Sequence, residues 1–352
     1  MVRKAKLAAL GLLRSAGCFE LVGNSTWRRQ RLLILCYHGV SLHDEHEWRP
    51  RLYMSPEQLD QRLELIERLR CSVLPLAEAL PRLQARDLPP RSVAITFDDG
   101  TYDFYKQAYP LLRRRGFPVT VYQTTYYSDY QVPVFNLICS YMLWQRRNDR
   151  LADVPELGLK QSFDLRTEAS RHRVVRTLVE QSERENLTGI QKNQMAKQLA
   201  GALGTDYAAL SASRILQLMN AQEVTEIGRT GVDIQLHTHR HRSPDQEALF
   251  RREIEDNRSR IQALTGKPAS HFCYPSGIYR EQFFTWLKNE CIDSAMTCDT
   301  GLASSNDNPY LLPRFVDTTG RTQLEYESWL TGVGSLVAFR RLAPQRYILP
   351  ED

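Results

Sequence analysis

The stretch "RSVAITFDDG", residues 91–100, places a run of mostly apolar residues directly before two adjacent carboxylates. The run does not alternate with charged residues, as a strand with one face in water would. An unbroken run of this kind is typical of a strand buried on both faces of a parallel sheet. Gly100 is suited to end such a strand in a turn. We therefore expect a central strand that ends at Asp98 and Asp99.

Segments with strand-like and helical patterns alternate on both sides of this stretch. Further strands are expected at 31–40, 117–125, 232–237, 271–277 and 294–299, and a short strand followed by a helix at 72–84. Helical spacing of apolar residues marks 55–69, 103–116, 220–231, 245–266 and 280–291. This alternation, with short joints, predicts an α/β fold with a parallel sheet. We expect an irregular or incomplete (β/α) barrel, because no glycine-rich phosphate turn follows the first strand as in many doubly wound sheets.

The chain has 352 residues, enough for one large domain or two of ordinary size. We expect an N-terminal amphipathic helix or extension at 1–30, the barrel at 31–320, and a C-terminal helix and tail at 321–352. Residues from about 130 to 215 are mostly polar and helical and interrupt the alternation. They predict a helical insertion in the barrel.

The composition is that of a globular protein, and the net charge of +5 is too weak to indicate nucleic acid as a partner. Seven scattered cysteines without a CxxC pair fit neither a disulfide framework nor a structural zinc site, and favour a reducing compartment. Leu7, Leu10 and Leu13 share one face of the N-terminal helix, which either packs on the domain or touches a membrane surface. The absence of a clear signal peptide favours the cytoplasm or the cytoplasmic face of the membrane.

Two adjacent carboxylates at a buried strand end repel each other unless a positive charge compensates them. A divalent metal ion would do so, with one carboxylate as ligand and the other free to act as a base. The alternative is that Asp98 and Asp99 cap the next helix or form a turn with Gly100.

Three of the eight histidines lie at alternate positions in "LHTHRHRSP", residues 236–244. In an extended chain, His237 and His241 would be about 13 Å apart, which is awkward for two ligands of one ion. A helical turn after Thr238 would bring positions i and i+4 to about 6 Å on one face. We therefore expect His237 and His241 to bind a metal with Asp99, and His239 to point elsewhere. Two histidines and one carboxylate with open positions suit a hydrolytic zinc site.

"TFDDG" followed by "HTHRH" resembles the polysaccharide deacetylase family, which shares its domain with the chitooligosaccharide deacetylases of nodulation. The first family motif, T-F-D-D-G, is matched without change, and the second, H-[ST]-x-x-H, is matched by His237, Thr238 and His241. The resemblance covers roughly residues 31–320. It implies an incomplete (β/α) barrel, with Asp98 as general base and Asp99, His237 and His241 as metal ligands. It also implies metal-dependent removal of acetyl groups from N-acetylated sugars.

The third family motif, R-x-P-[YF]-G, differs here and reads Cys273-Tyr274-Pro275-Ser276-Gly277. Cys273 takes the place of the arginine that orients the base. Ser276 takes the place of the aromatic residue, and its backbone N–H is expected to serve the oxyanion. Tyr274 and Pro275 are expected to contact the substrate.

Arg314, in "LPRF", is the candidate to supply the missing positive charge near Asp98, and it is counted with the substrate-binding residues. The general acid has two candidates, His38 and His271. Many family members use a late histidine, but no histidine follows His271. The branch that acts on poly-N-acetylglucosamine has a circularly permuted motif order and a Y-H pair at the first strand end. His38, after Tyr37, matches that pair, and a purely structural role for His38 is the alternative.

The expected partner is therefore an N-acetylated poly- or oligosaccharide of the exopolysaccharide type, and the expected cofactor is a divalent metal ion, with zinc as the default. Two alternatives stay open: an amide hydrolase with the same site that acts on a small molecule or a lipid-linked sugar, and a non-catalytic carbohydrate-binding relative.

Overall fold

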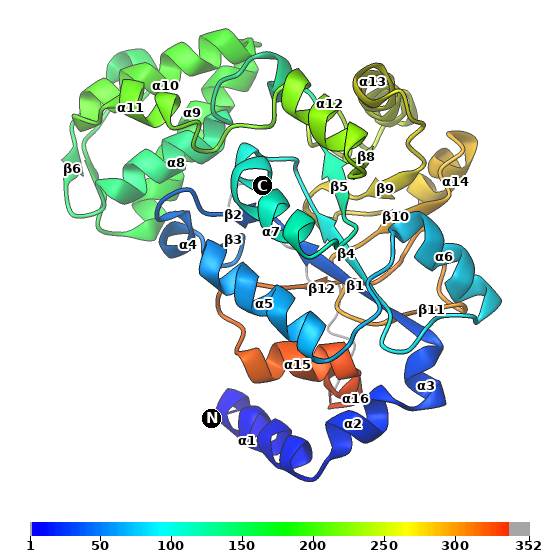
Figure 1. Ribbon diagram of the computed structural model, residues 1–352. Coiled ribbons are helices and arrows are strands. Elements are labelled where there is room, and N and C mark those ends of the chain that lie inside the picture. Colours follow the sequence, from blue (N-terminus) through cyan, green and yellow to red (C-terminus); the bar gives the residue numbers. More distant parts are fainter. Residues whose placement is uncertain (1, 338–352) are drawn as a thin grey trace.

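The strand predicted at 91–100 lies in the middle of a curled parallel sheet (Figure 1). The computed structural model describes residues 2–337. Neighbouring strands of the sheet run parallel, in the order β10 (Ser294–Met296), β9 (His271–Cys273), β8 (Asp233–Leu236), β5 (Thr120–Gln123), β4 (Val93–Phe97) and β1 (Arg31–Tyr37). All six strands lie inside segments predicted as strands.

The far edge of β1 is covered by two short strands that were not predicted. Strand β11 (Ala303–Ser304) pairs antiparallel with the start of β1, and β12 (Phe315–Val316) pairs parallel with its end. Leu312 bridges to Met296 of β10, so residues 309–316 connect the two edges of the curled sheet. The predicted incomplete (β/α) barrel is thereby confirmed.

The strand register places the predicted site residues that follow β1, β4 and β8 at one rim. Leu33 pairs with Val93 and Tyr37 with Phe97, while Gln123 pairs with Leu236. Because the strands are parallel, their carboxyl ends meet at the same edge of the barrel, where catalytic residues of such folds are found.

The two faces of the sheet pack against different helices. Leu33 and Leu35 belong to the core under the outer helices, whereas Leu32 and Ile34 point to the opposite face and pack with α6 (Leu76–Ala85). The outer helices are α5 (Pro56–Arg68), α7 (Tyr109–Arg114), α12 (Ala221–Arg229), α13 (Glu247–Thr265), α14 (Glu281–Asn289) and α15 (Gln323–Thr331). The helix predicted at 103–116 begins as a π-helical turn, η1 (Phe104–Ala108), before it continues as α7.

The predicted helical insertion leaves the barrel after β5 and returns at α12 and β8. It contains α8 (Phe135–Gln145), α9 (Glu168–Arg184), α10 (Gly189–Leu203), α11 (Tyr207–Ala212), the hairpin of β6 (Arg150–Leu151) and β7 (Phe163–Asp164), and η3 (Pro155–Leu157). We call residues 130–215 the cap. Its helices share a hydrophobic core of their own, which includes Ile138, Leu178 and Leu199, and they lie at one side of the barrel (Figure 1).

The cap is anchored to the barrel through residues that follow β1. These form β2 (Gly39–Val40), α4 (Glu45–Trp48) and β3 (Tyr53–Met54). The Trp48 ring meets the Tyr141 ring of α8 edge-on, with centroids 5.3 Å apart. The cap core therefore continues into the loop beside the predicted site.

The N-terminal segment forms α1 (Val2–Ser15), α2 (Cys18–Gly23) and α3 (Thr26–Arg29), and α16 (Val333–Val337) follows α15. Leu10 of the predicted amphipathic helix packs with Phe19 and Val333, whereas Leu12 is exposed. Residues 338–352 of the predicted C-terminal tail lie outside the described residues. Within residues 2–337, no helix combines the length and the apolar character needed to cross a membrane.

Candidate active site

A cavity of about 340 Å³ opens where the strand ends meet the cap. It is lined by seven of the residues singled out in the sequence: His38, Asp98, Asp99, His237, His241, Tyr274 and Ser276. Pro275 and Arg314 do not line the cavity, although both lie next to residues that do. His271 is the first residue of β9, at the opposite end of that strand from Cys273. It hydrogen-bonds Ser294 and does not line the cavity.

Asp99, His237 and His241 converge on one point of the cavity. Asp99 Oδ1 lies 3.3 Å from Nε2 of His237 and 3.3 Å from Nε2 of His241. One ligand atom of each residue lies within 4.8 Å of those of the other two, which is a spacing that a single metal ion can bridge.

The hydrogen bonds of His237 decide which of its nitrogens faces this point. Its Nδ1 lies 2.8 Å from the carbonyl oxygen of Cys273. Because a carbonyl only accepts, Nδ1 carries the proton in the neutral ring, and the lone pair of Nε2 is directed at Asp99. Two acceptors then face each other unless a cation lies between them or the ring is protonated. The donor set therefore fits a divalent metal ion, and the Nδ1 hydrogen bond is the support that a metal-bound histidine usually has.

The pKa values of Asp99 and His241 keep these two groups in forms that can bind a metal. Burial alone would raise the pKa of Asp99, but the hydrogen bond to His237 and the nearby His241 outweigh it and lower this pKa to about 2. For His241, burial by the surrounding protein lowers the pKa to about 4, against the opposing effect of Asp99. At neutral pH, Asp99 is ionised and His241 is neutral, as ligands must be.

The backbone reaches this arrangement through left-handed residues. Asp99, Thr238 and His241 have φ values of 70°, 60° and 55°. The turn after β8 is therefore not the helical turn expected from the sequence. Thr238 itself adopts the left-handed conformation, and its Oγ1 accepts a hydrogen bond from the backbone N–H of Arg242. The outcome for the two rings is the predicted one, since the centroids of His237 and His241 lie 4.9 Å apart.

His239 points away from the two other histidines. Its Nδ1 lies 2.8 Å from Thr125 Oγ1, and its ring meets Tyr126 edge-on. It lines the cavity but does not join the group formed by Asp99, His237 and His241.

Asp98 binds Arg314. The guanidinium donates to both carboxylate oxygens, with Nη1–Oδ1 and Nη2–Oδ2 distances of 2.7 Å. Arg314 is fully buried and also donates to the carbonyl oxygen of Thr297. Burial would raise the pKa of Asp98, but the Arg314 guanidinium outweighs it and holds this pKa well below the usual range. Arg314 thus supplies the charge that the altered third motif lacks.

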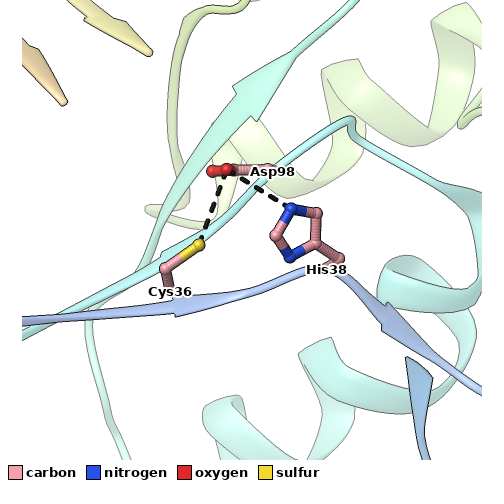
Figure 2. A group of neighbouring side chains, drawn as sticks. All are labelled: Cys36, His38 and Asp98. Atoms are coloured by element: carbon pink, nitrogen blue, oxygen red, sulfur yellow. Dashed lines mark hydrogen bonds and ion pairs between the residues drawn. The ribbon is translucent and has the colours of Figure 1, made fainter. Parts of the chain in front are cut away.

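His38 and Cys36 approach Asp98 from the end of β1 (Figure 2). Nε2 of His38 lies 3.8 Å from Asp98 Oδ2, beyond hydrogen-bond distance, and the ring borders the cavity. Its Nδ1 is buried and has no hydrogen-bond partner among residues 2–337. Cys36 Sγ and Cys273 Sγ each lie 3.5 Å from Asp98 Oδ2.

Two other groups have spacings that could suit a metal: Cys36 with His38 and Asp98, and Asp98 with His237 and Cys273. Both use Asp98, whose two oxygens already accept from Arg314. A cation there would lie beside the guanidinium. Burial also raises the pKa of both thiols well above the usual value, so they stay protonated and are poor ligands. The group of Asp99, His237 and His241 is therefore the best metal site in the described part of the chain.

Sequence reasoning missed Asn257, a buried residue of α13 that ties the site together. Its Oδ1 accepts from the backbone N–H of His237, and its Nδ2 donates to Gln123 O and Thr125 Oγ1, each at 3.0 Å. Asn257 thus links the ends of β8 and β5. A polar residue on an otherwise apolar helix face was the available signal, but it does not reveal the partner.

Fold and site together define a barrel hydrolase with a carboxylate, two histidines and a separate buried carboxylate at the rim. The sequence model of the polysaccharide deacetylase family matches residues 85–290, more than half of the chain. The chain belongs to this family and is, by class, an N-deacetylase hydrolase.

Solved structures with the same fold share little sequence. The deacetylase PplD of Streptococcus pyogenes, solved with acetate, is 16% identical, with a TM-score of 0.57 over 86% of this chain and 98% of that one. IcaB of Ammonifex degensii is 16% identical, with a TM-score of 0.52 over 86% and 97%. A de-N-acetylase of Aggregatibacter actinomycetemcomitans is 13% identical, with a TM-score of 0.50 over 83% and 97%. No curated protein matches the chain.

Proposed function

We propose that this protein is a metal-dependent N-deacetylase of N-acetylated amino sugars in a poly- or oligosaccharide of the exopolysaccharide type. One observation carries the proposal: three metal-binding donors converge beside a second carboxylate that faces its own buried arginine. The site thus separates a ligand, Asp99, from a base, Asp98. The description of one similar structure as a de-N-acetylase supports the same reaction.

Asp99, His237 and His241 would hold the metal ion, and zinc is the default for two nitrogens and one carboxylate oxygen. A divalent ion at this point would polarise the acetyl carbonyl group and make a water molecule more acidic.

Asp98 acts as the base that takes a proton from the attacking water. Arg314 keeps Asp98 ionised and fixes its direction, because it binds both carboxylate oxygens. The same guanidinium makes a proton on Asp98 weakly held, so the proton can pass on. Arg314 is thus a positioning residue, since it does not line the cavity.

His38 is placed to protonate the departing amine, because it borders the cavity 3.8 Å from Asp98. Ser276 also lines the cavity, and its backbone N–H would stabilise the oxyanion. Tyr274, which lines the cavity, and Pro275, which precedes Ser276, shape the wall against which the sugar lies.

The substitution Asp98→Asn tests the assignment of the base. We expect the variant to keep its metal, because no ligand changes, and to lose activity by about two to four orders of magnitude, the usual contribution of a general base. Acetate release and metal content are measured on the same preparation. Full activity of the variant would disprove the role of Asp98.

The substrate class is tested by mass spectrometry of acetate loss from N-acetylated oligosaccharides and from small N-acetylated amides, with and without a chelator. We expect loss from the oligosaccharides only, and none with the chelator. Turnover of small amides alone would instead support a small-molecule amidase, and no turnover of any compound by the metal-loaded protein would support a non-catalytic relative.

A further inference from the structure

The cavity wall beyond the metal and base residues is rich in cations. It is lined by Arg49, Arg51, Lys192, Arg240 and Arg242. Among the lining residues that the structure describes, Glu183 is the one acid besides Asp98 and Asp99. These cations come from three separate segments: the loop before β3, helix α10 of the cap, and the turn after β8.

These cations differ in whether a carboxylate lies within ion-pair distance of them. Arg240 Nη1 lies 2.9 Å from Glu253 Oε1 and 3.4 Å from Asp256 Oδ2, so its charge is balanced. Arg242 Nη2 lies 3.0 Å from Glu183 Oε1. Lys192, in contrast, has no carboxylate within ion-pair distance anywhere in residues 2–337.

Lys192 is half-buried on the side of α10 that faces the cavity. Burial lowers the pKa of its ammonium group, and the neighbouring Arg242 lowers it further, while Glu183 opposes both effects. One glutamate is therefore shared by two cations. A partly desolvated cation without its own counter-ion is unfavourable. An anionic group of a ligand would remove this cost.

We propose that Lys192 and Arg242 bind an anionic substituent of the N-acetylated glycan, a carboxylate or a phosphate, so that the preferred substrate is an acidic glycan. The inference rests on the proposed deacetylase function and specifies its substrate class. The charged group lies beside the sugar that is deacetylated, because both cations line the same cavity as the metal ligands. Two sources share this chemistry: a uronate within the polymer, and a phosphate ester on the sugar.

The test compares three sets of substrates of similar length: neutral N-acetylglucosamine oligosaccharides, oligosaccharides that alternate N-acetylglucosamine with glucuronate, and phosphorylated N-acetylglucosamine compounds. Each is assayed for kcat and KM with the wild type, Lys192→Gln and Lys197→Gln. Lys197 lies on the same helix but is exposed and does not line the cavity, so its variant is the matched control for charge loss.

We expect one charged set to have a higher kcat/KM than the neutral set, and Lys192→Gln to reduce that ratio about tenfold through KM, the loss expected for one charge-assisted hydrogen bond. Lys197→Gln should keep the ratio of the wild type. The charged set that shows the effect identifies the source of the anion. Equal kcat/KM for neutral and charged substrates, or an equal ratio in the two lysine variants, would overturn the inference.

A binding measurement separates this inference from the proposed function. Calorimetry with the same oligosaccharides reports affinity without turnover. If no substrate were deacetylated but the charged set bound the wild type more tightly than Lys192→Gln, the deacetylase proposal would fail and the anion site would stand. If acetate were released and charge had no effect on binding, only the anion site would fail.

Discussion

At the scale of single residues, two adjacent aspartates have different tasks because the backbone turns between them. The side chains of β4 point alternately to the two faces of the sheet, and Asp98 continues this pattern. Asp98 points at Arg314 inside the barrel, where it is almost fully buried. Asp99 adopts a left-handed φ of 70°, which directs its carboxylate to the histidines of the β8 turn. One change of φ thus places one carboxylate beside a guanidinium and the other beside His237 and His241.

Alanine variants of the three histidines in "HTHRH" should differ in how much metal they retain. We expect His237→Ala and His241→Ala to lose the bound metal, since each removes one of three ligands, and His239→Ala to retain it, since that ring bonds Thr125 instead. Metal content after dialysis is the measurement. Loss of metal in His239→Ala with retention in His241→Ala would refute the ligand set.

Arg314→Met should be among the most damaging substitutions in the barrel. It leaves the Asp98 carboxylate buried without its partner, and removal of one member of a buried pair costs about 3–5 kcal/mol of folding free energy. Urea unfolding measures the loss. The double variant Asp98→Asn with Arg314→Met should recover part of it, because no buried charge then remains unpaired. A double variant less stable than Arg314→Met alone would show that the pair is not the cause.

The sequence predicted that Asp99, His237 and His241 come together, and it predicted the positions of the strands along the chain, because both depend on local patterns. Buried strands appear as apolar runs, and the ligand motifs directly follow two of them. It named Arg314 as a candidate for the positive charge near Asp98, but it could not show the two hydrogen bonds between them, because this contact joins residues 216 positions apart. The left-handed conformation of Thr238 was missed as well, because a β-branched residue rarely adopts it and the neighbouring residues do not predict it.

At the scale of elements, the site depends on how α13 is fixed to the ends of β5 and β8. Asn257 makes three hydrogen bonds across this junction, and Glu253 of the same helix accepts from the backbone N–H of Arg240. The helix therefore holds both sides of the turn that carries His237 and His241.

Asn257→Ala tests this link. The variant leaves buried backbone and hydroxyl groups without partners, and we expect it to lose about 2 kcal/mol of stability and to bind metal more weakly, although no ligand is removed. Ser259→Ala, an exposed change on the same helix, is the control. Metal titration and unfolding are followed together. Unchanged metal affinity in a destabilised Asn257→Ala would mean that the helix supports the fold but not the site.

At the scale of the whole molecule, a buried acid beneath the site makes folding stability depend on pH. Burial raises the pKa of Asp103 from 3.8 to about 8, and the nearby Glu45 adds to this, although Thr101 and Val40 donate hydrogen bonds to Asp103 Oδ1. The pKa of Asp103 is higher in the folded protein than in the unfolded chain. The contribution of Asp103 to folding stability is therefore fully present below about pH 4. It is lost as the pH rises through about 8.

Asp103→Asn should remove this loss, because an amide keeps the Oδ1 acceptor and does not ionise. We expect the variant to gain stability relative to the wild type between about pH 5 and pH 8. The difference between their urea midpoints at several pH values isolates this residue from other titrating groups. A difference that stays constant with pH would show that Asp103 is not protonated in the folded protein.

The bond between Asp98 and Arg314 also has a consequence for the order of events during synthesis. A ribosome that has just completed "TFDDG" must add over two hundred further residues before Arg314 leaves the exit tunnel. Throughout that time the Asp98 carboxylate of the growing chain has no counter-charge from Arg314. Products of premature termination before residue 314 should therefore be inert toward sugars, and hydrolytic competence appears only once translation has passed the last barrel strand.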